Sequence, residues 1–155
     1  MRLLFLLLLF LCVGCQRHVG SQPVLSAGRV DVFKSVELVR VYDGDTFIIN
    51  LPDTIPDVFS REISVRIRHI DTAEIKSTDT CERDVAIKAK TITHSLLKNA
   101  KVITLENVGR DKFFRLDATV IADNVDVGKF LLDKGYAVPY EGGVKSKVDW
   151  CKKLK

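Results

Sequence analysis

The sequence lacks several features that would place it at once in a specialised class. It has no internal repeat and no low-complexity tract, and its 46% hydrophobic and 28% charged residues exclude a wholly disordered chain. Its longest apolar run, Leu3–Val13, is too short to cross a bilayer as a helix. His69 has no second His or Cys at ligand spacing, which argues against a metal role for it. The 155 residues therefore suit one ordinary domain.

Segment 1–15 has the composition of an export signal. Arg2 gives a short basic region and Leu3–Val13 an apolar region. The residues before Cys15 resemble a bacterial lipobox, so two outcomes stay open, a lipid anchor on Cys15 or ordinary cleavage nearby. We expect an exported protein that is secreted, periplasmic or tethered to the cell-envelope membrane. Loss of the segment removes only Arg2, and the formal net charge of +4 becomes +3, which permits a polyanionic partner without demonstrating one.

Residues 16–33 carry Gly, Ser, Gln and Pro without a period and are predicted to form a flexible linker. The domain is then expected over 34–155. Its first strand is predicted at Val36–Val41, which is rich in β-branched residues. Asp43-Gly44 is a typical hairpin turn, so Thr46–Leu51 is predicted to be the return strand.

A long loop and further strands are expected after this hairpin. Residues 52–62 contain two prolines and are predicted to be irregular. Ile63–Arg68 alternates apolar and polar residues, which predicts a half-buried strand with Ser64, Arg66 and Arg68 on its outward face. Two more strands are predicted over Val102–Leu105 and Leu116–Ile121.

Helical spacing appears over 79–98. The apolar stripe consists of Val85, Ala89, Ile92 and Leu96. Asp79 with Glu82 predicts a capping box, and Asn99 predicts a left-handed end. A second helix is predicted over Val127–Leu132, with Gly135 as its cap. Five strands with a helix after the third predict an α+β, mainly β fold: a five-stranded OB-fold barrel with two to three helices, which suggests a monomer.

Four short segments carry the charged and aromatic residues that chemistry would need. They are Asp43–Thr46, Arg66–Glu74, Asp111–Arg115 and Gly135–Tyr140. The first is an acidic turn, and the second ends a strand in two carboxylates preceded by an arginine. The third is a charged turn that enters a strand. Each segment alone is weak, because such turns are common in proteins without this chemistry.

Taken together, the segments resemble the staphylococcal nuclease-like (thermonuclease) family over Val36–Tyr140. The matching elements are DGDT, R-x4-DT-x-E and D-K-x-x-R, at compatible spacings. The resemblance implies a calcium-dependent endonuclease that hydrolyses phosphodiester bonds of DNA and RNA and leaves 3′-phosphate ends. The alternative is a nuclease-like module that binds nucleic acid without cutting it, and a structural envelope lipoprotein is a third possibility.

The resemblance also implies a calcium site. Asp45 and Asp71 would supply carboxylate oxygens to Ca²⁺, and Thr72 would supply its backbone carbonyl. Calcium accepts such an irregular, partly hydrated set of oxygen ligands. Glu74 would lie just beyond the ion, linked through water, as general base for the attacking water.

Two arginines are implied as catalytic residues. Arg66 and Arg115 match the catalytic arginines of the family. A planar guanidinium can hold two phosphate oxygens and stays charged throughout the reaction. Tyr140 would correspond to the tyrosine on which a substrate base stacks, with a one-residue difference in length.

The sequence departs from well-known family members at three places. Phe113 stands where those members have Tyr, so a hydroxyl that could bond the substrate phosphate is missing. Ala73 replaces the usual Pro, and the loop 52–62 is longer than in the smallest members.

The C-terminal region carries two further expectations. Resemblance to family members around Cys81-Glu82 and Trp150-Cys151 implies a disulfide between Cys81 and Cys151, with two free thiols as the alternative. The basic run Lys145–Lys155 is expected to be solvated surface, with contact to a nucleic-acid backbone as the alternative.

Overall fold

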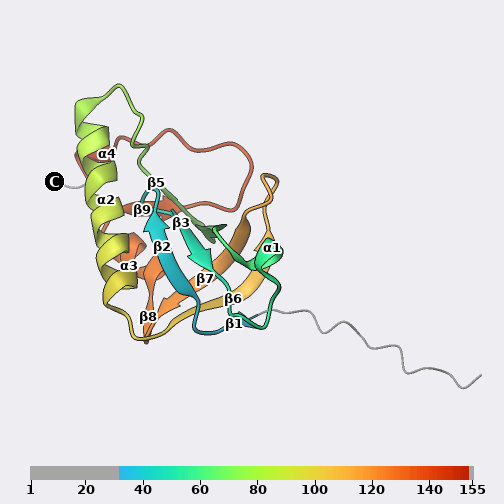
Figure 1. Cartoon of the computed structure of the whole chain (residues 1–155). Coiled ribbons are helices and arrows are strands. Elements are labelled where there is room, and N and C mark those ends of the chain that lie inside the picture. The colour runs from blue at the N-terminus through green and yellow to red at the C-terminus, as the bar shows by residue number, and fades with distance from the viewer. Residues whose placement is uncertain (1–31, 154–155) are drawn as a thin grey trace, which may run out of the picture.

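A computed structural model describes residues 32–153. The predicted export segment 1–15, Cys15 and nearly all of the predicted linker lie outside the described residues. None of the described helices is both long and apolar enough to cross a membrane. In Figure 1 the long helix α2 (Thr80–Asn99) lies along one side of a sheet, and the one-turn helix α1 (Asp57–Ser60) lies on the opposite side.

One seven-stranded sheet forms the body of the molecule. Its strands are β1 (Val32–Phe33), β2 (Glu37–Val41), β3 (Thr46–Asn50), β4 (Ile63–Ile67), β6 (Ile103–Arg110), β7 (Leu116–Ala122) and β8 (Val125–Asp126). The hydrogen-bonded order is β1-β6-β7-β4-β3-β2, with β8 beside β7, and only β4 and β7 run parallel. The Val36 N–H donates to the Ile103 carbonyl at 3.1 Å, so the start of β2 meets β6. The sheet thus curls back on itself, although no continuous closed ladder is present among residues 32–153.

The five longer strands and α2 follow the predicted order, and the fold is mixed α+β and mainly sheet. Several differences arise, and the described residues form nine strands instead of the predicted five. β1 takes the last two residues of the predicted linker, and α1 forms inside the predicted loop 52–62. β6 continues past Leu105 through a bulge at which Asn107 has φ +51°. The described chain has four helices instead of two to three, because α1 and α4 (Trp150–Lys153) are single turns.

Helix α2 begins at a side-chain cap. The Asp79 carboxylate accepts from the N–H groups of Cys81 and Glu82 at 2.8 and 3.2 Å. The predicted capping box is incomplete, because Glu82 accepts from the Ser77 hydroxyl and gives no reciprocal bond. The predicted left-handed end is wrong: the helix runs to Asn99, and the next residue, Ala100, is extended.

The buried face of α2 differs from the predicted stripe. Its fully buried members are Val85, Ala86, Ala89, Thr93 and Leu97, while Ile92 and Leu96 are half-buried. The true stripe includes a threonine, which a search for apolar residues passes over. Leu97 joins the main core between the sheet and the helices, where Phe47, Ile49, Val65, Leu105 and Val120 have no exposed surface.

Helix α3 (Val127–Asp133) ends in the predicted glycine cap. Gly135 has φ +77°, and its N–H donates to the Leu132 carbonyl at 3.0 Å. The Tyr136 N–H donates to the Leu131 carbonyl at 2.9 Å, which completes a Schellman motif. This turn directs the chain into β9 (Ala137–Pro139), which pairs with β5 (Ile70–Thr72) in a separate two-stranded sheet.

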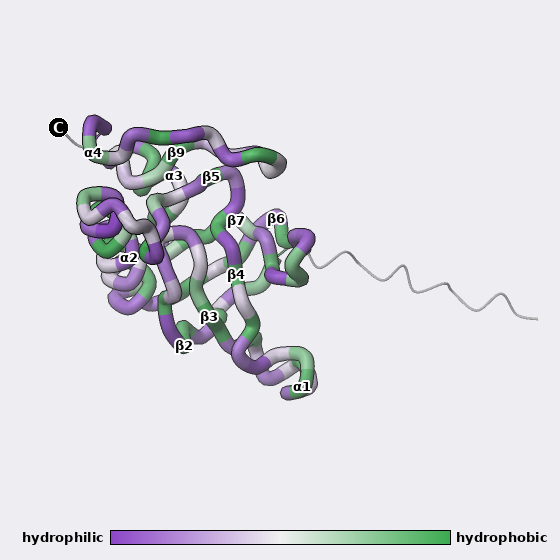
Figure 2. Tube along the Cα trace, turned by 90° about the horizontal axis from the view of Figure 1, so that it is seen from above, coloured by the Kyte–Doolittle hydropathy of each residue, from purple (hydrophilic) through white to green (hydrophobic). Residues whose placement is uncertain are grey.

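The C-terminal segment is fixed to the start of α2. Trp150 is 5% exposed and packs in a second core cluster with Ala73, Val85 and Ala86. The structure joins Cys81 to Cys151 in a disulfide. Figure 2 shows the segment between β9 and α4 as an outer layer that runs past β5 toward α2.

Candidate active site

The acidic turn between β2 and β3 is locked against α2 and β5. A side chain at Gly44 would lie 2.8 Å from the Ala89 Cβ and 2.9 Å from the Thr72 hydroxyl, so only glycine fits. The buried Thr93 hydroxyl donates to the Gly44 carbonyl at 2.7 Å. On the other side, the Asp45 carbonyl accepts from the Ile67 N–H at 2.8 Å. The packing therefore fixes the backbone that carries Asp45.

Asp45 and Asp71 share one arginine. Nη2 of Arg66 lies 3.2 Å from Oδ2 of Asp45 and 3.4 Å from Oδ1 of Asp71, and all three side chains are about nine-tenths buried. Burial raises the pKa of Asp45 to about 6, although the charge of Arg66 works in the opposite direction. Burial also raises the pKa of Asp71, against the opposing effects of Lys145 and Arg66. For both carboxylates, the cost of burying the charge therefore exceeds the stabilisation by the neighbouring cations.

Pairing between β5 and β9 positions Asp71 and Thr72. Asp71 lies opposite Val138, and Thr72 lies opposite Ala137. Both Asp71 and Thr72 are buried. The predicted outward face of Ile63–Arg68 needs correction, because Arg66 is only 8% exposed and lies beneath Asp45, Asp71 and the later chain.

A lysine from the C-terminal segment enters the acidic cluster. Nζ of Lys145 lies 2.9 Å from Oδ1 of Asp71 and also contacts Oε1 of Glu74. Partial burial disfavours its charged form, yet the hydrogen bonds to Glu74 and Asp71 raise the pKa of Lys145 overall. The expectation that the run Lys145–Lys155 is only solvated surface is therefore wrong at Lys145. Glu74 itself is exposed.

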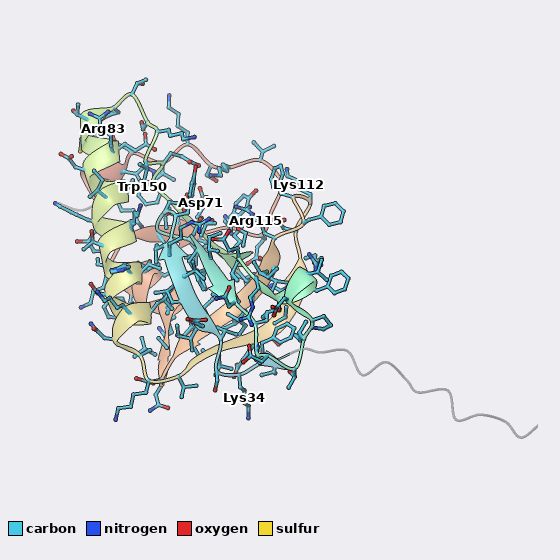
Figure 3. The ribbon with its side chains drawn as sticks, in the orientation of Figure 1. Lys34, Asp71, Arg83, Lys112, Arg115 and Trp150 are labelled. Carbon is cyan, nitrogen blue, oxygen red and sulfur yellow. A yellow bond between two sulfur atoms is a disulfide. The ribbon has the colours of Figure 1, made fainter. Side chains whose placement is uncertain are left out.

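Arg115 approaches the same site from the turn before β7. Its Nε donates to the Asp111 carboxylate at 2.7 Å, and its Nη1 donates to the Thr46 hydroxyl at 3.4 Å. That hydroxyl in turn donates to Asp45 at 2.9 Å. Burial alone would raise the pKa of Asp111, but the hydrogen bonds from Arg115 and from the backbone of Phe113 lower it overall. Asp71 and Arg115 lie at the same end of the sheet in Figure 3.

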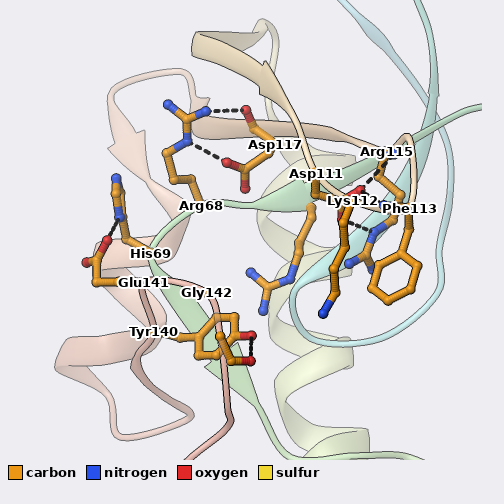
Figure 4. A pocket seen from close by; sticks show the side chains of 12 residues that line it. Arg68, His69, Asp111, Lys112, Phe113, Arg115, Asp117, Tyr140, Glu141 and Gly142 are labelled. Atoms are coloured by element: carbon orange, nitrogen blue, oxygen red, sulfur yellow. Dashed lines mark hydrogen bonds and ion pairs between the residues drawn. The ribbon is translucent and has the colours of Figure 1, made fainter.

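A pocket of about 300 Å³ opens beside Arg66 and Arg115 (Figure 4). Two acids in its wall are paired with a cation, Asp111 with Arg115 and Asp117 with Arg68 at 2.7 Å, and Glu141 lies 2.6 Å from Nδ1 of His69. Lys112 forms no ion pair with the described residues and lies 5.2 Å from the Phe113 ring. Arginine and lysine side chains outnumber the carboxylates in the wall by four to three, which suits an anionic ligand.

Tyr140 stands at the junction between this pocket and the acidic cluster. The Arg66 guanidinium carbon lies 5.1 Å from the centre of the Tyr140 ring. The Tyr140 hydroxyl donates to the Gly143 carbonyl at 2.9 Å, which leaves the ring at the pocket wall. The exposed Phe113 lies on another part of the wall, and the guanidinium carbon of Arg115 is 5.5 Å from its ring centre.

The described residues contain no cluster of three or more His, Cys, Asp or Glu side chains around a common point. Two buried carboxylates near each other do fit a hard divalent cation, because calcium completes its shell with backbone carbonyls and water. In this structure the ammonium of Lys145 lies at the Asp71 carboxylate, 2.9 Å from Oδ1. Asp45, Asp71 and the carbonyl of Thr72 are the residues that would hold calcium.

The structure brings together the predicted residues Asp45, Arg66, Asp71, Thr72 and Arg115 and places Glu74 and Tyr140 beside them. Sequence reasoning missed Thr93 and Lys145, which act over 49 and 71 residues. No local pattern marks either residue. A threonine on an otherwise apolar helix face was the one available sign for Thr93.

Two arginines and two buried carboxylates thus lie together at one end of the sheet, an arrangement that suits phosphate chemistry. A family model described as staphylococcal nuclease homologue matches residues 64–154, and the chain belongs to this family. The predicted resemblance is confirmed, and a nuclease-like domain with the family's OB-type fold follows. Asp45 lies outside the matched range, whereas Arg66, Asp71, Glu74 and Arg115 lie inside it. A search of curated proteins gives no match.

Proposed function

We propose that the chain is a calcium-dependent nuclease that hydrolyses phosphodiester bonds of DNA and RNA and leaves 3′-phosphate ends. The observation that supports it best is the chain of contacts from Asp71 through Arg66 and Asp45 to Thr46 and Arg115. In it the Arg66 guanidinium lies between the two carboxylates, and the Arg115 guanidinium reaches Asp45 through the Thr46 hydroxyl. Such an arrangement suits a phosphate that gains negative charge as the reaction proceeds.

Each side chain has a defined task in this proposal. Bound calcium would supply positive charge to a phosphate oxygen. Arg66 and Arg115 bind the other phosphate oxygens and offset the charge that develops on them, which is worth roughly 10²–10³-fold for each donor. Glu74 accepts a proton from the attacking water, and its exposed position leaves room for that water. The ring of Tyr140 stacks on a substrate base.

The test is cleavage of plasmid DNA and of a structured RNA by the purified domain, with calcium or with a chelator. Cleavage that requires calcium is expected, and the DNA fragments should support polymerase extension only after phosphatase treatment. Glu74→Gln should abolish turnover, while Glu62→Gln, which alters an exposed carboxylate paired with Arg40, should not. Equal cleavage with the chelator would contradict the proposal. Binding without cleavage under every condition would instead identify a non-cutting nucleic-acid-binding module.

We also propose that the protein works outside the cytoplasm. The apolar segment 1–15 supports export, and a disulfide between Cys81 and Cys151 suits an oxidising compartment. Expression in bacteria followed by fractionation and intact-mass measurement should show a secreted, periplasmic or lipid-modified form without the segment. A cytoplasmic protein that retains residues 1–15 would contradict this proposal.

A further inference from the structure

The segment that carries Lys145 is held at few points. Residues 141–149, here named the strap, contain neither helix nor strand. Gly142 and Gly143 have φ +89° and +86°, and an added Cβ on either would meet no atom within 4 Å. No protein therefore packs against these two glycines on the side where a Cβ would point.

Two described contacts join the middle of the strap to the rest of the protein, the ion pairs of Lys145 and the hydrogen bond from the Tyr140 hydroxyl to the Gly143 carbonyl. The Lys145 ammonium contacts Asp71 and Glu74, whereas the neighbouring side chains of Val144 and Ser146 are exposed. The strap is anchored at one end by Glu141 on His69 and at the other by the buried Trp150 next to the disulfide. Lys145 thus lies on a segment that is held at both ends, and its ammonium contacts the carboxylates of Asp71 and Glu74.

We propose that Lys145 is a tethered competitor of the metal ion, which occupies the carboxylate site in the metal-free protein and must withdraw before calcium binds. The inference rests on the proposed calcium site and adds a residue that sets its affinity. A carboxylate oxygen that holds an ammonium at 2.9 Å cannot at the same time give its full charge to a calcium ion 2.3–2.6 Å away.

The tether makes this competition effective. A free ammonium ion at physiological concentration would compete poorly, but a group attached at both sides has a high effective concentration at its target. Calcium then binds only to molecules in which Lys145 has moved away. The apparent affinity is the intrinsic affinity multiplied by the fraction of molecules in that state. Because Lys145 is 46% exposed, its ion pairs are partly screened, and the competition is moderate.

Lys147 offers a matched control. It lies on the same strap, carries the same charge and forms no ion pair with the residues described. Lys145→Met and Lys147→Met therefore make the same change in net charge. The change in overall charge is the same in the two variants, so a large difference between them reports the contact of Lys145 with Asp71 and Glu74.

The experiment is calorimetric titration of calcium into the metal-free full domain at fixed ionic strength. Lys145→Met should bind calcium about tenfold more tightly than Lys147→Met, as expected for the loss of two partly exposed ion pairs. As a second readout, brief acetylation followed by mass spectrometry compares the two amines in the wild-type protein. Lys145 should react more slowly than Lys147 without calcium and equally fast with it.

The outcomes separate this inference from the proposed function. If calcium binds but Lys145→Met binds it no more tightly than Lys147→Met, the competition is overturned and the nuclease proposal stands. The same holds if acetylation of Lys145 is indifferent to calcium. If no variant binds calcium, even without Lys145, the calcium-dependent function fails and this inference fails with it.

Discussion

At the scale of single residues, the site depends on how firmly Arg115 is held. Both oxygens of Asp111 bind it, one through the Arg115 backbone N–H at 3.0 Å and one through Nε at 2.7 Å. The guanidinium plane is thereby fixed before a phosphate arrives, which avoids the cost of ordering it during the reaction. A lysine would keep the charge but could not keep both this pairing and the contact with Thr46.

Arg115→Lys is therefore expected to lower kcat roughly 10²-fold with a smaller change in KM. Steady-state kinetics on a short oligonucleotide measure both. Arg40→Lys is the control, because Arg40 forms only an exposed pair with Glu62. A change in KM alone would show that Arg115 contributes binding and no preferential stabilisation of the transition state.

Asp45 gives a prediction about pH. Its pKa is about 6 in the folded protein against 3.8 as the ordinary value, so folding favours the protonated form. Ionised Asp45 thus destabilises the metal-free fold above about pH 6, and the penalty disappears below about pH 4. Asp45→Asn should increase the free energy of unfolding at pH 8 by at most about 3 kcal/mol and so raise the melting temperature. The melting temperatures of the two proteins should become equal toward pH 4. Thermal melts in chelator across this range measure it.

Calcium provides a control for the Asp45→Asn variant. Only the wild-type protein should gain stability from the ion, because a ligand that binds the native state shifts unfolding by mass action. A pH-independent difference between Asp45→Asn and the wild type would show that Asp45 carries no unusual ionisation.

Charged residues in short motifs could be predicted from the sequence because their neighbours in the chain are also their neighbours in space. Arg66 and Asp71 are five positions apart, and so are found together by spacing alone. Lys145 reaches Asp71 across 74 positions, and no local pattern encodes that contact. This contact forms only because the turn at Gly135, the pairing of β9 with β5 and the path of the strap bring Lys145 to Asp71.

At the scale of elements, α2 supports the acidic turn. The Thr93 hydroxyl is buried and donates to the Gly44 carbonyl across 49 positions. Removal of a buried donor leaves the carbonyl unsatisfied, which costs about 1–3 kcal/mol. Since Asp45 follows Gly44 directly, a shift of this carbonyl also moves the carboxylate.

Thr93→Val is expected to lower the free energy of unfolding by about 1–3 kcal/mol and to weaken calcium binding. Urea unfolding and calcium titration measure the two effects. Thr91→Val is the matched control on the same helix, because Thr91 is exposed and its hydroxyl donates only to the Ile87 carbonyl one turn earlier. Equal effects of both variants would contradict a specific role for Thr93.

Elements with strong local patterns matched their predictions, and short ones did not. The long β-branched and alternating runs predicted β2, β3 and β4, and twenty residues of helical spacing predicted α2. β5 and β9 have three residues each and exist as strands only because they pair with each other. A stretch of three residues carries too little periodicity to be recognised. Asp71 lies in β5, whose pairing with β9 could not be predicted. The sequence motif therefore predicted the residue but not the strand that positions it.

At the scale of the whole molecule, the C-terminal segment closes the structure over its own site. The chain leaves β9 at Pro139, passes over the acidic cluster as the strap and returns to α2 at Trp150. Burial of Trp150 and the disulfide hold the end of the strap. If Lys145 competes with calcium as proposed, the disulfide that holds this segment also affects the access of a cation to Asp71.

Cys151→Ser tests this coupling. The disulfide joins residues 70 positions apart, and a loop of this length is worth about 4 kcal/mol in the chain-entropy model. The expected loss in free energy of unfolding is about 2–4 kcal/mol, since terminal segments are released easily. Calcium affinity should stay the same or increase, because Asp45 and Asp71 lie on other elements and a looser strap lets Lys145 withdraw. Cys81→Ser and the double variant should lose the same amount as Cys151→Ser, because all three remove one bond. Additive losses, or two alkylatable thiols in the oxidised wild-type protein, would show that the two cysteines act separately.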